Sequence, residues 1–172
     1  MKKTIIIGLI IVASTVLIDQ ISKLLMVSLL VNEGRTIGVI DNFFKLQLQY
    51  NKGAAFSSFS GNFPFLMLMT AVATIVFVIM ARWACFDTKK FYSWGLYLMI
   101  GGMIGNFIDR VFNRDLGVVD FLSFTFFGWD FAVFNLADSF LVVGVICLMI
   151  DLIFFDGKRE KAKNELEYDD YI

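Results

Sequence analysis

The sequence predicts an all-α membrane protein with four transmembrane helices and a small β-sheet or flap outside the membrane. Of its 172 residues 58% are hydrophobic, and the mean hydropathy is +0.73. Soluble domains have about 45–50% apolar residues. Four runs reach the ~20 mostly apolar residues needed to cross a bilayer. The length fits a single membrane-embedded domain covering residues 1–172.

The first predicted helix covers about residues 4–28, TIIIGLIIVASTVLIDQISKLLMVS. Its beginning, MKKTIIIGLIIVA, is similar to the first half of a signal peptide. However, no cleavage site of small residues follows, and the run continues through Asp19 and Lys23. We therefore expect a retained helix, which satisfies its own backbone groups inside the membrane.

The first outer loop is predicted at residues 29–62 and contains FFKLQLQYN (43–51). Apolar and polar residues alternate from Lys45 to Tyr50, which is the pattern of a half-buried strand. This alternation predicts a small sheet or an extended flap on the membrane surface. NKGAAF (51–56) follows and has two interpretations: the chain simply re-enters the membrane, or Gly53 lets the backbone approach a ligand closely.

The other three helices are predicted at about 63–81, 91–111 and 131–153, with a second outer loop at 112–130. Orientation follows from the excess of Lys and Arg in cytoplasmic segments. With the N-terminus inside, the inner segments carry nine Lys and Arg residues and the outer loops carry four. We therefore expect both termini to be cytoplasmic. The acidic tail NELEYDD is most simply a solvated terminus.

The amino-acid composition argues against several classes of function. The chain has no His, which is the commonest general base, a member of the usual serine triad and the usual zinc ligand. Cys85 and Cys147 are far apart, in a predicted inner turn and in an apolar helix, and suggest neither a disulfide nor a metal site. We therefore expect no metal and no cofactor. The net charge of −1 provides no basic surface for nucleic acid.

Polar residues inside the predicted helices are candidates for function, because ionisable groups are rare and costly there. They form stripes on three helices, all toward the outer side, at spacings of three or four residues that share a helix face. The alternative interpretation for the first two stripes is that their charges neutralise each other within or between helices and that Asn forms hydrogen bonds across helices. Asp151 lies near the inner end and is expected to be interfacial. The stripes are Asp19 with Lys23, Asn106 with Asp109 and Arg110, and Asn135 with Asp138.

Two acids have no opposite charge nearby in sequence. If the fourth helix begins near residue 131, Asp138 lies only ~10 Å below its start. Asp120 lies in the second outer loop, within VVDF. The two carboxylates therefore suggest a shared site at the outer membrane boundary, where water is available.

Two close carboxylates cannot both ionise easily, so one of them keeps a proton and the pair titrates as a unit. The ionised carboxylate can activate water and the protonated one can donate to a carbonyl, which is acid–base hydrolysis without a metal. Asn51, Asn106 and Asn135 could orient the peptide or the carboxylates. Arg110 could hold a backbone carbonyl or a lipid headgroup.

Two other functions are compatible with this composition. A proton-coupled transporter uses membrane acids as relays, but it favours acids near the midplane and often internal repeats. Here the acids lie toward one face and no repeat is evident. A non-enzymatic scaffold predicts that Asp120→Asn and Asp138→Asn change little except stability.

Five motifs in order carry a resemblance to a known family. They are DQISK (19–23), NKGAAF (51–56), GGMIGNFIDR (101–110), VVDF (118–121) and FNLADS (134–139). Each is weak alone, but together they span nearly the whole chain, which resembles the lipoprotein signal peptidase family, signal peptidase II. The family often has Pro two residues before the FN pair, where this chain has Ala132.

The resemblance implies an aspartic peptidase of the bacterial cytoplasmic membrane with its site toward the extracytoplasmic face. Such an enzyme cleaves prolipoproteins just before a diacylglyceryl-modified cysteine. The resemblance implies further that the sheet cradles the substrate, that lipids are partners, and that a globomycin-like peptide inhibits. It places the catalytic pair at Asp120 and Asp138. Site support falls on Asn106, Arg110 and Asn135, with less certain roles for Asp19, Lys23, Asn51, Gly53 and Asp109.

Overall fold

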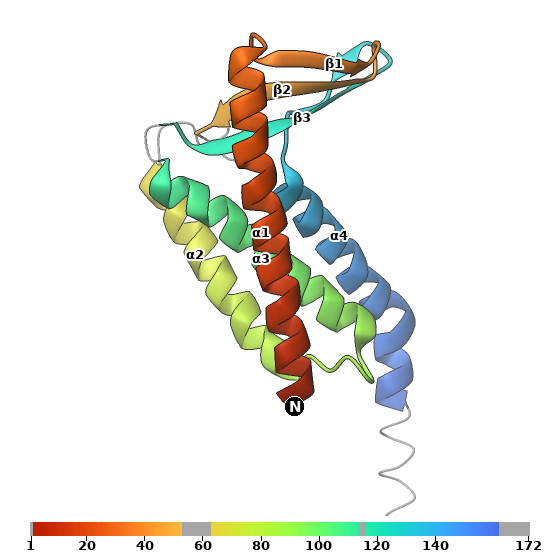
Figure 1. Ribbon diagram of the computed structural model, residues 1–172. Coiled ribbons are helices and arrows are strands. Elements are labelled where there is room, and N and C mark those ends of the chain that lie inside the picture. Colours follow the sequence, from red (N-terminus) through yellow and green to blue (C-terminus); the bar gives the residue numbers. More distant parts are fainter. Residues whose placement is uncertain (1, 53–62, 114–115, 162–172) are drawn as a thin grey trace, which may run out of the picture.

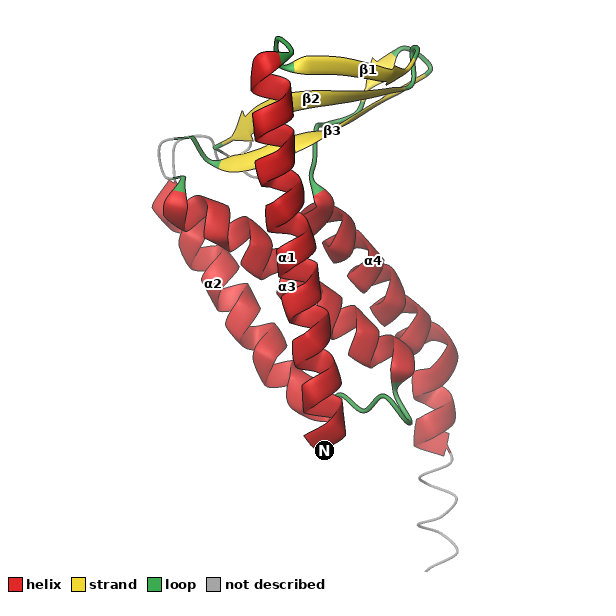
Figure 2. Ribbon diagram, in the orientation of Figure 1, coloured by secondary structure: helices red, strands yellow, loops and turns green. Residues whose placement is uncertain are grey.

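Four helices form a bundle, and a four-stranded sheet lies across one end of it in the computed structural model (Figure 1, Figure 2). The structure describes residues 2–52, 63–113 and 116–161. The predicted site residue Gly53 lies outside these ranges. The helices are α1 (Lys2–Asn32), α2 (Phe63–Met80), α3 (Lys90–Phe112) and α4 (Leu136–Asp151).

Helix α3 is the centre of the bundle and packs against α1, α2 and α4. Its glycines allow this close approach. A Cβ atom on Gly101 would lie 2.7 Å from Thr15 Cβ of α1, and one on Gly102 would lie 2.6 Å from the Ala137 carbonyl oxygen of α4. The run GGMIG is therefore a packing surface for two neighbouring helices. The buried apolar residues around it are Ile11, Tyr97, Met99, Ile100 and Met103.

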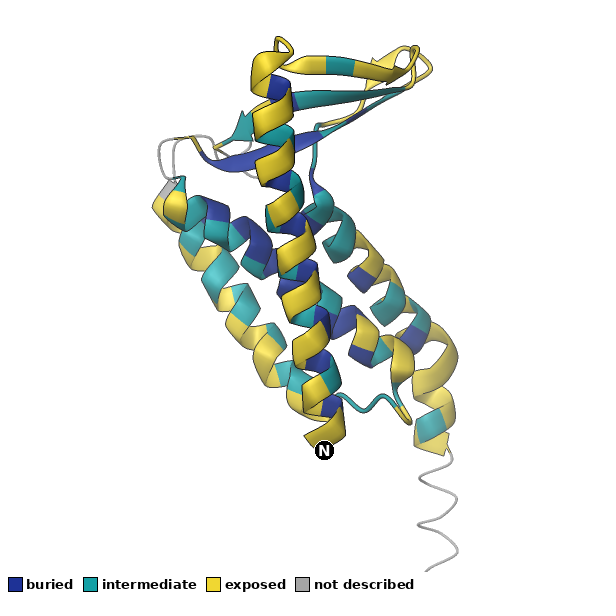
Figure 3. Cartoon of the chain, viewed as in Figure 1, coloured by how far each residue is buried: buried dark blue, intermediate teal, exposed yellow. Residues whose placement is uncertain are grey.

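Three helical segments are long and apolar enough to cross a membrane: Lys2–Asn32, Pro64–Trp83 and Leu136–Lys161. The remaining predicted span, residues 91–111, is helix α3 at the expected place, but it does not reach the same hydropathy. The reason is its position, because α3 is enclosed by the other helices and its polar residues face them. Exposed apolar residues gather instead on the outward faces of α1, α2 and α4 (Figure 3).

The sheet has strand order β1 (Thr36–Ile40), β2 (Phe44–Asn51), β3 (Val118–Phe126) and β4 (Trp129–Asp130), with every pair antiparallel. The sequence predicted a sheet from the first outer loop alone. Half of the sheet instead comes from the second outer loop, and Asp120 lies on a strand opposite Gln49. The sheet is fixed to the bundle by Leu48, Val119 and Phe121, which pack with Leu30 of α1.

Helix α4 begins at Leu136, so the prediction that it begins near residue 131 was wrong. The preceding residues are held in an extended conformation by β3. Phe131 N–H donates to the Phe124 carbonyl, and Phe134 N–H donates to the Leu122 carbonyl. As a result Asp138 lies in the first turn of α4 rather than ~10 Å below the helix start.

Candidate active site

Asp120 and Asp138 line one cavity of about 970 Å³ between the sheet and the outer end of α4. We call it the outer cavity. Asp120 projects from β3 and is 2% exposed, whereas Asp138 is half-buried. The strands give the cavity a polar wall and α4 gives it an apolar wall. The polar lining includes Gln47, Gln49, Asn51, Asn106, Arg110 and Ser123, and the apolar lining includes Leu141, Val142 and Val143.

Asn135 joins the two carboxylates. It is the N-cap of α4, and its side-chain oxygen accepts the Asp138 N–H at 3.0 Å. In return the Asp138 carboxylate accepts the Asn135 N–H at 3.2 Å, which completes a capping box. The Asn135 amide nitrogen donates to Asp120 at 2.7 Å. One fully buried side chain thus caps the helix and fixes the second acid.

Two more asparagines complete the set of donors. Asn51 of β2 donates to Asp120 at 3.1 Å, and Asn106 of α3 donates to Asp138 at 2.8 Å. All four carboxylate oxygens of the pair therefore accept a hydrogen bond from an asparagine. Within the described part of the chain, no Lys or Arg forms a salt bridge with either acid. The carboxylates are thus positioned by neutral donors.

Burial first, and then the negative charge of Asp138, raise the pKa of the Asp120 carboxyl, which reaches about 7. Hydrogen bonds from Asn51 and Asn135 act against this rise without cancelling it. A proton is therefore available to the pair close to neutral pH. A pair that holds one proton has both an acid and a base, as general acid–base hydrolysis requires.

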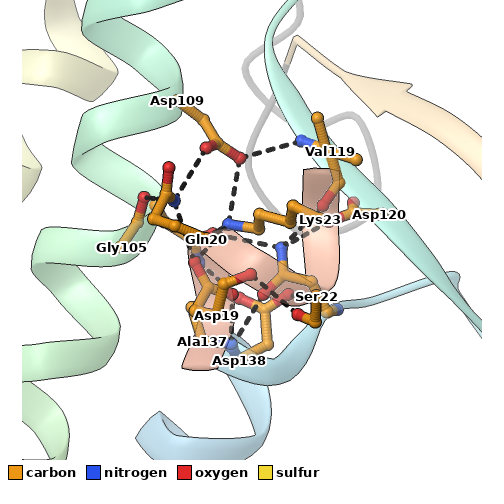
Figure 4. Close-up of polar contacts among 12 residues, drawn as sticks. Asp19, Gln20, Ser22, Lys23, Gly105, Asp109, Val119, Asp120, Ala137 and Asp138 are labelled. Atoms are coloured by element: carbon orange, nitrogen blue, oxygen red, sulfur yellow. Dashed lines mark hydrogen bonds and ion pairs between the residues drawn. The ribbon is translucent and has the colours of Figure 1, made fainter. Parts of the chain in front are cut away.

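Behind the pair lies a buried charge cluster centred on Lys23 (Figure 4). The Lys23 ammonium is 2.8 Å from Asp19 of its own helix and 2.9 Å from Asp109 of α3. It also donates to the side-chain oxygen of Asn106 at 3.0 Å. That contact orients the Asn106 amide so that its nitrogen faces Asp138.

Asp19 and Asp109 of the cluster each hold the backbone beside one of the two carboxylates of the outer cavity. The second oxygen of Asp19 accepts the N–H of Ala137 at 2.9 Å, directly before Asp138. Asp109 accepts the N–H of Val119 at 3.0 Å, directly before Asp120. The predicted pairing of Asp19 with Lys23 is therefore present, and it also connects to both carboxylates of the site.

Sequence reasoning missed Gln20, which bridges this cluster. Its amide nitrogen lies 3.1 Å from Asp19, from Asp109 and from the Gly105 carbonyl oxygen. The signal was present, because Gln20 stands between Asp19 and Lys23 in an apolar helix, but a spacing of three or four residues does not include a residue next to Asp19. Sequence reasoning also missed three residues of the cavity wall, Gln47, Gln49 and Ser123. For Ser123 the reason is that a loop was predicted where the structure has strand β3.

Arg110 lies on the wall of the outer cavity, and its guanidinium contacts the Asn106 carbonyl oxygen at 3.3 Å. It is half-buried near the negative charges of Asp120 and Asp138. The structure thus brings the predicted site residues within the described ranges to the outer cavity, to the Lys23 cluster behind it or, for Asn135, to the bridge between the two carboxylates.

Known proteins match this chain over most of its length. The sequence profile of the family described as signal peptidase (SPase) II matches residues 11–154. The lipoprotein signal peptidase of Geobacillus kaustophilus (strain HTA426) is 39% identical over 145 residues, covering 84% of this chain and 92% of that protein. That of Bacillus pumilus (strain SAFR-032) is 40% identical over 146 residues, covering 84% of this chain and 90% of that protein.

Solved structures show the same fold. One structure of a bacterial membrane enzyme superposes with a TM-score of 0.70 at 32% identity, covering 86% of this chain and 93% of the other. A second, also described as a bacterial membrane enzyme, gives a TM-score of 0.68 at 32% identity, covering 85% and 87%.

Proposed function

The chain belongs to the signal peptidase II family of aspartic peptidases, and from this premise we propose how it acts. It removes the signal peptide from bacterial prolipoproteins, cutting just before a cysteine that carries diacylglycerol. Asp120 and Asp138 are the catalytic pair. The main observation in favour of this proposal is that both carboxylates line one cavity and are joined through Asn135.

Catalysis begins with one proton on the pair and a water molecule between the carboxylates and the scissile carbonyl. The ionised carboxylate takes a proton from water while the water oxygen bonds to the carbonyl carbon. The protonated carboxylate donates its proton to the carbonyl oxygen. When the tetrahedral intermediate collapses, that hydroxyl returns its proton to the pair and the C–N bond breaks. The leaving nitrogen takes the other proton, and the pair again holds one.

The two walls of the outer cavity fit the two parts of this substrate. The peptide lies along the polar strands, where Gln47, Gln49 and Ser123 offer hydrogen bonds to an extended backbone. The acyl chains lie against Val142 and Val143 of α4 and enter sideways from the lipid. Arg110 holds a substrate carbonyl or a headgroup oxygen at the junction. The cavity faces the extracytoplasmic side of the cytoplasmic membrane, with both termini inside.

The supporting residues act through position. Asn51, Asn106 and Asn135 orient the carboxylates, and the Lys23 cluster with Asp19 and Asp109 fixes the backbone beside each of them. A globomycin-like peptide is expected to occupy the outer cavity and to compete with the substrate.

The test uses purified protein in detergent with a diacylglyceryl-modified prolipoprotein and a chelator throughout. Cleavage is followed by gel shift for the wild type, Asp120→Asn and Asp138→Asn. We expect cleavage by the wild type alone, with a loss of at least about 1,000-fold in each variant. Asp130→Asn is a matched control, because this acid also lines the outer cavity but is exposed. It should keep near wild-type activity.

Near wild-type cleavage by Asp120→Asn or Asp138→Asn, at unchanged folding, would remove that residue from the chemistry. Chelator-sensitive cleavage would contradict hydrolysis by the carboxylates alone. Failure of the wild type on a confirmed lipidated substrate would overturn the assignment, and proton flux across vesicles would then test a transporter.

A further inference from the structure

The turn between β3 and β4 exposes large aromatic side chains to the surroundings. Phe127 at its tip is 110% exposed, Trp129 is 58% exposed and Phe126 is 43% exposed. No charged residue occurs from Phe121 to Trp129. We call residues 126–129 the aromatic turn. Phe126 packs against Phe43 and Phe124, whereas the fully exposed ring of Phe127 adds nothing to the packing of the sheet.

The backbone conformation of this turn is unfavourable for a phenylalanine at position 127. Phe127 has φ +51 and Gly128 has φ +81, so both adopt the left-handed conformation. Two-residue turns of this kind favour Asn-Gly or Asp-Gly, and a bulky side chain at positive φ is an outlier. A phenylalanine is therefore held in an unfavourable backbone conformation, with its ring pointing away from the protein. Strain of this sort is typical of functional positions.

The aromatic turn is continuous with the start of a membrane-spanning segment. Trp129 contacts Phe131 at 5.9 Å between ring centroids, and Phe131 contacts Phe134 at 5.9 Å. Phe134 is followed directly by Asn135, the N-cap of α4. On the other strand, Phe126 contacts Phe43 at 5.7 Å. A row of rings thus runs from the tip of the sheet to the helix end.

Helix α1 indicates how far the apolar surroundings extend. Its 31 residues are about 46 Å long, longer than the ~30 Å hydrocarbon core. Its outer end lies at the level of the sheet (Figure 1), yet that end still exposes apolar side chains. Leu24 is 72% exposed, Leu25 60% and Val31 56%. The boundary between lipid and water therefore lies close to the sheet.

From these observations we propose that the aromatic turn inserts Phe127 and Trp129 into the outer boundary of the lipid bilayer. Trp concentrates at this boundary, where its ring lies at the level of the headgroups, and Phe occurs with Trp on the buried face of helices that lie in it. The partner is the lipid surface of the membrane that the helices cross. Insertion would hold the sheet against the bilayer and keep the outer cavity open toward the lipid. The location of the turn can be tested independently of peptide cleavage.

The chain has three tryptophans, which makes a fluorescence test direct. A Trp83→Phe, Trp94→Phe variant leaves Trp129 alone, and a Trp83→Phe, Trp129→Phe variant leaves Trp94 of α3 as the reference. Both are reconstituted in phosphatidylcholine vesicles with brominated acyl chains. We expect Trp129 to be quenched most by bromines near the headgroup and to be protected from iodide. Strong quenching of Trp129 by iodide without quenching by bromolipids would overturn the proposal. Protection of Trp129 from both quenchers would overturn it as well and would indicate a protein partner.

A second variant tests the role of Phe127. Phe127→Asn, made in the protein that keeps Trp129 alone, suits the left-handed turn, so the fold should be kept. We expect bromolipid quenching to fall at least twofold and iodide quenching to rise. Asn42→Gly is the matched control, since Asn42 also has positive φ in a sheet turn but carries no ring. It should leave quenching unchanged. Unchanged quenching in Phe127→Asn would overturn insertion by this residue.

Discussion

Asparagine side chains, and not a cation, contact the carboxylates of Asp120 and Asp138, which we propose as the catalytic pair. A Lys or Arg in direct contact would favour the ionised form of both acids and remove the shared proton. The amide nitrogens of Asn51, Asn106 and Asn135 satisfy the buried oxygens and leave the net charge of the pair unchanged. Lys23 and Arg110 lie near the pair, but Lys23 is already paired with two other acids, and Arg110 donates to the Asn106 carbonyl oxygen. This division of roles keeps one proton available near neutral pH.

The first prediction concerns the pH dependence of cleavage. Because the pKa of Asp120 is raised to about 7, the pair loses its shared proton as the pH rises through that value. We expect kcat/KM to fall about tenfold per pH unit well above pH 7. It can be measured from pH 5 to 9 with constant detergent and salt. A rate that keeps rising to pH 9 would contradict a protonated carboxyl as the acid.

The same raised pKa predicts the sign of a stability change. Protonated Asp120 stabilises the fold fully below its unfolded pKa near 4, and this contribution is lost as the pH rises through about 7. The melting temperature of Asp120→Asn should therefore rise relative to that of the wild type between pH 5 and pH 8. A pH-independent difference between the two proteins would be inconsistent with this assignment.

The substitution Asn135→Asp distinguishes the two roles of Asn135, which are to cap α4 and to donate a hydrogen bond to Asp120. An aspartate still caps α4 but places an oxygen, instead of the donor nitrogen, against Asp120. We expect activity to fall at least about 100-fold while the melting temperature changes by only a few degrees. Asn135→Ala should lose both. If Asn135→Asp retained cleavage, the bridge would be unnecessary for positioning.

Lys23→Met leaves two buried acids without their cation. Removing one partner of a buried ion pair destabilises a protein by about 3–5 kcal/mol. Because Lys23 acts through the backbone beside the carboxylates and does not line the outer cavity, kcat should fall while KM stays near its wild-type value. Lys23→Arg should recover part of the stability. A raised KM with normal kcat would indicate a role in substrate binding instead.

At the scale of elements, hydropathy located the helices but not the start of α4. The apolar run begins at Phe131, five residues before the helix, and hydropathy does not show that Phe131 and Phe134 are bonded to β3 through their backbone. The boundary was nonetheless visible as Asn135 followed by Asp138, which is a capping pattern. β3 escaped prediction because its pairing with β2 joins residues about 70 apart, which local alternation cannot show.

Gly105 offers a test of helix packing next to the site. A Cβ atom there would lie 2.6 Å from an Asp19 oxygen. We therefore expect Gly105→Ala to displace Asp19, lower the melting temperature and reduce cleavage at least tenfold. Gly157→Ala is the matched control, because a Cβ at Gly157 meets no atom within 4 Å. Equal behaviour of the two variants would mean that the close approach of α1 and α3 does not position the site.

For the whole molecule, the five sequence motifs identified the family and most residues of the site, while their mutual contacts could not be foreseen. The polar stripes indicated that Asp19, Lys23 and Asp109 face other helices. They did not indicate that Asp19 accepts the Ala137 N–H. Nor did they indicate that Asp109 accepts the Val119 N–H. Such contacts depend on side-chain geometry across the bundle and across a sheet built from two separate loops.

Orientation in the membrane is a property of the whole chain and has its own test. In a Cys147→Ser background, Cys85 becomes the single cysteine and lies between α2 and α3. With both termini cytoplasmic, it should react with a membrane-impermeant maleimide only after permeabilisation. Asp41→Cys, with both native cysteines replaced by serine, should react in intact cells from which any outer membrane has been removed. The opposite pattern would reverse the topology.

The pairing of Asp19 with Lys23 also affects how the protein is made. Asp19 meets the Ala137 N–H, a partner 118 residues further along the chain, so the first helix enters the membrane long before its site exists. Two separate charges would oppose that insertion. At i and i+4 they neutralise each other within one helix. We therefore expect the pair to let the first helix insert on its own, after which the Asp19–Lys23 ion pair stays closed and gains Asp109 and the Ala137 N–H as partners.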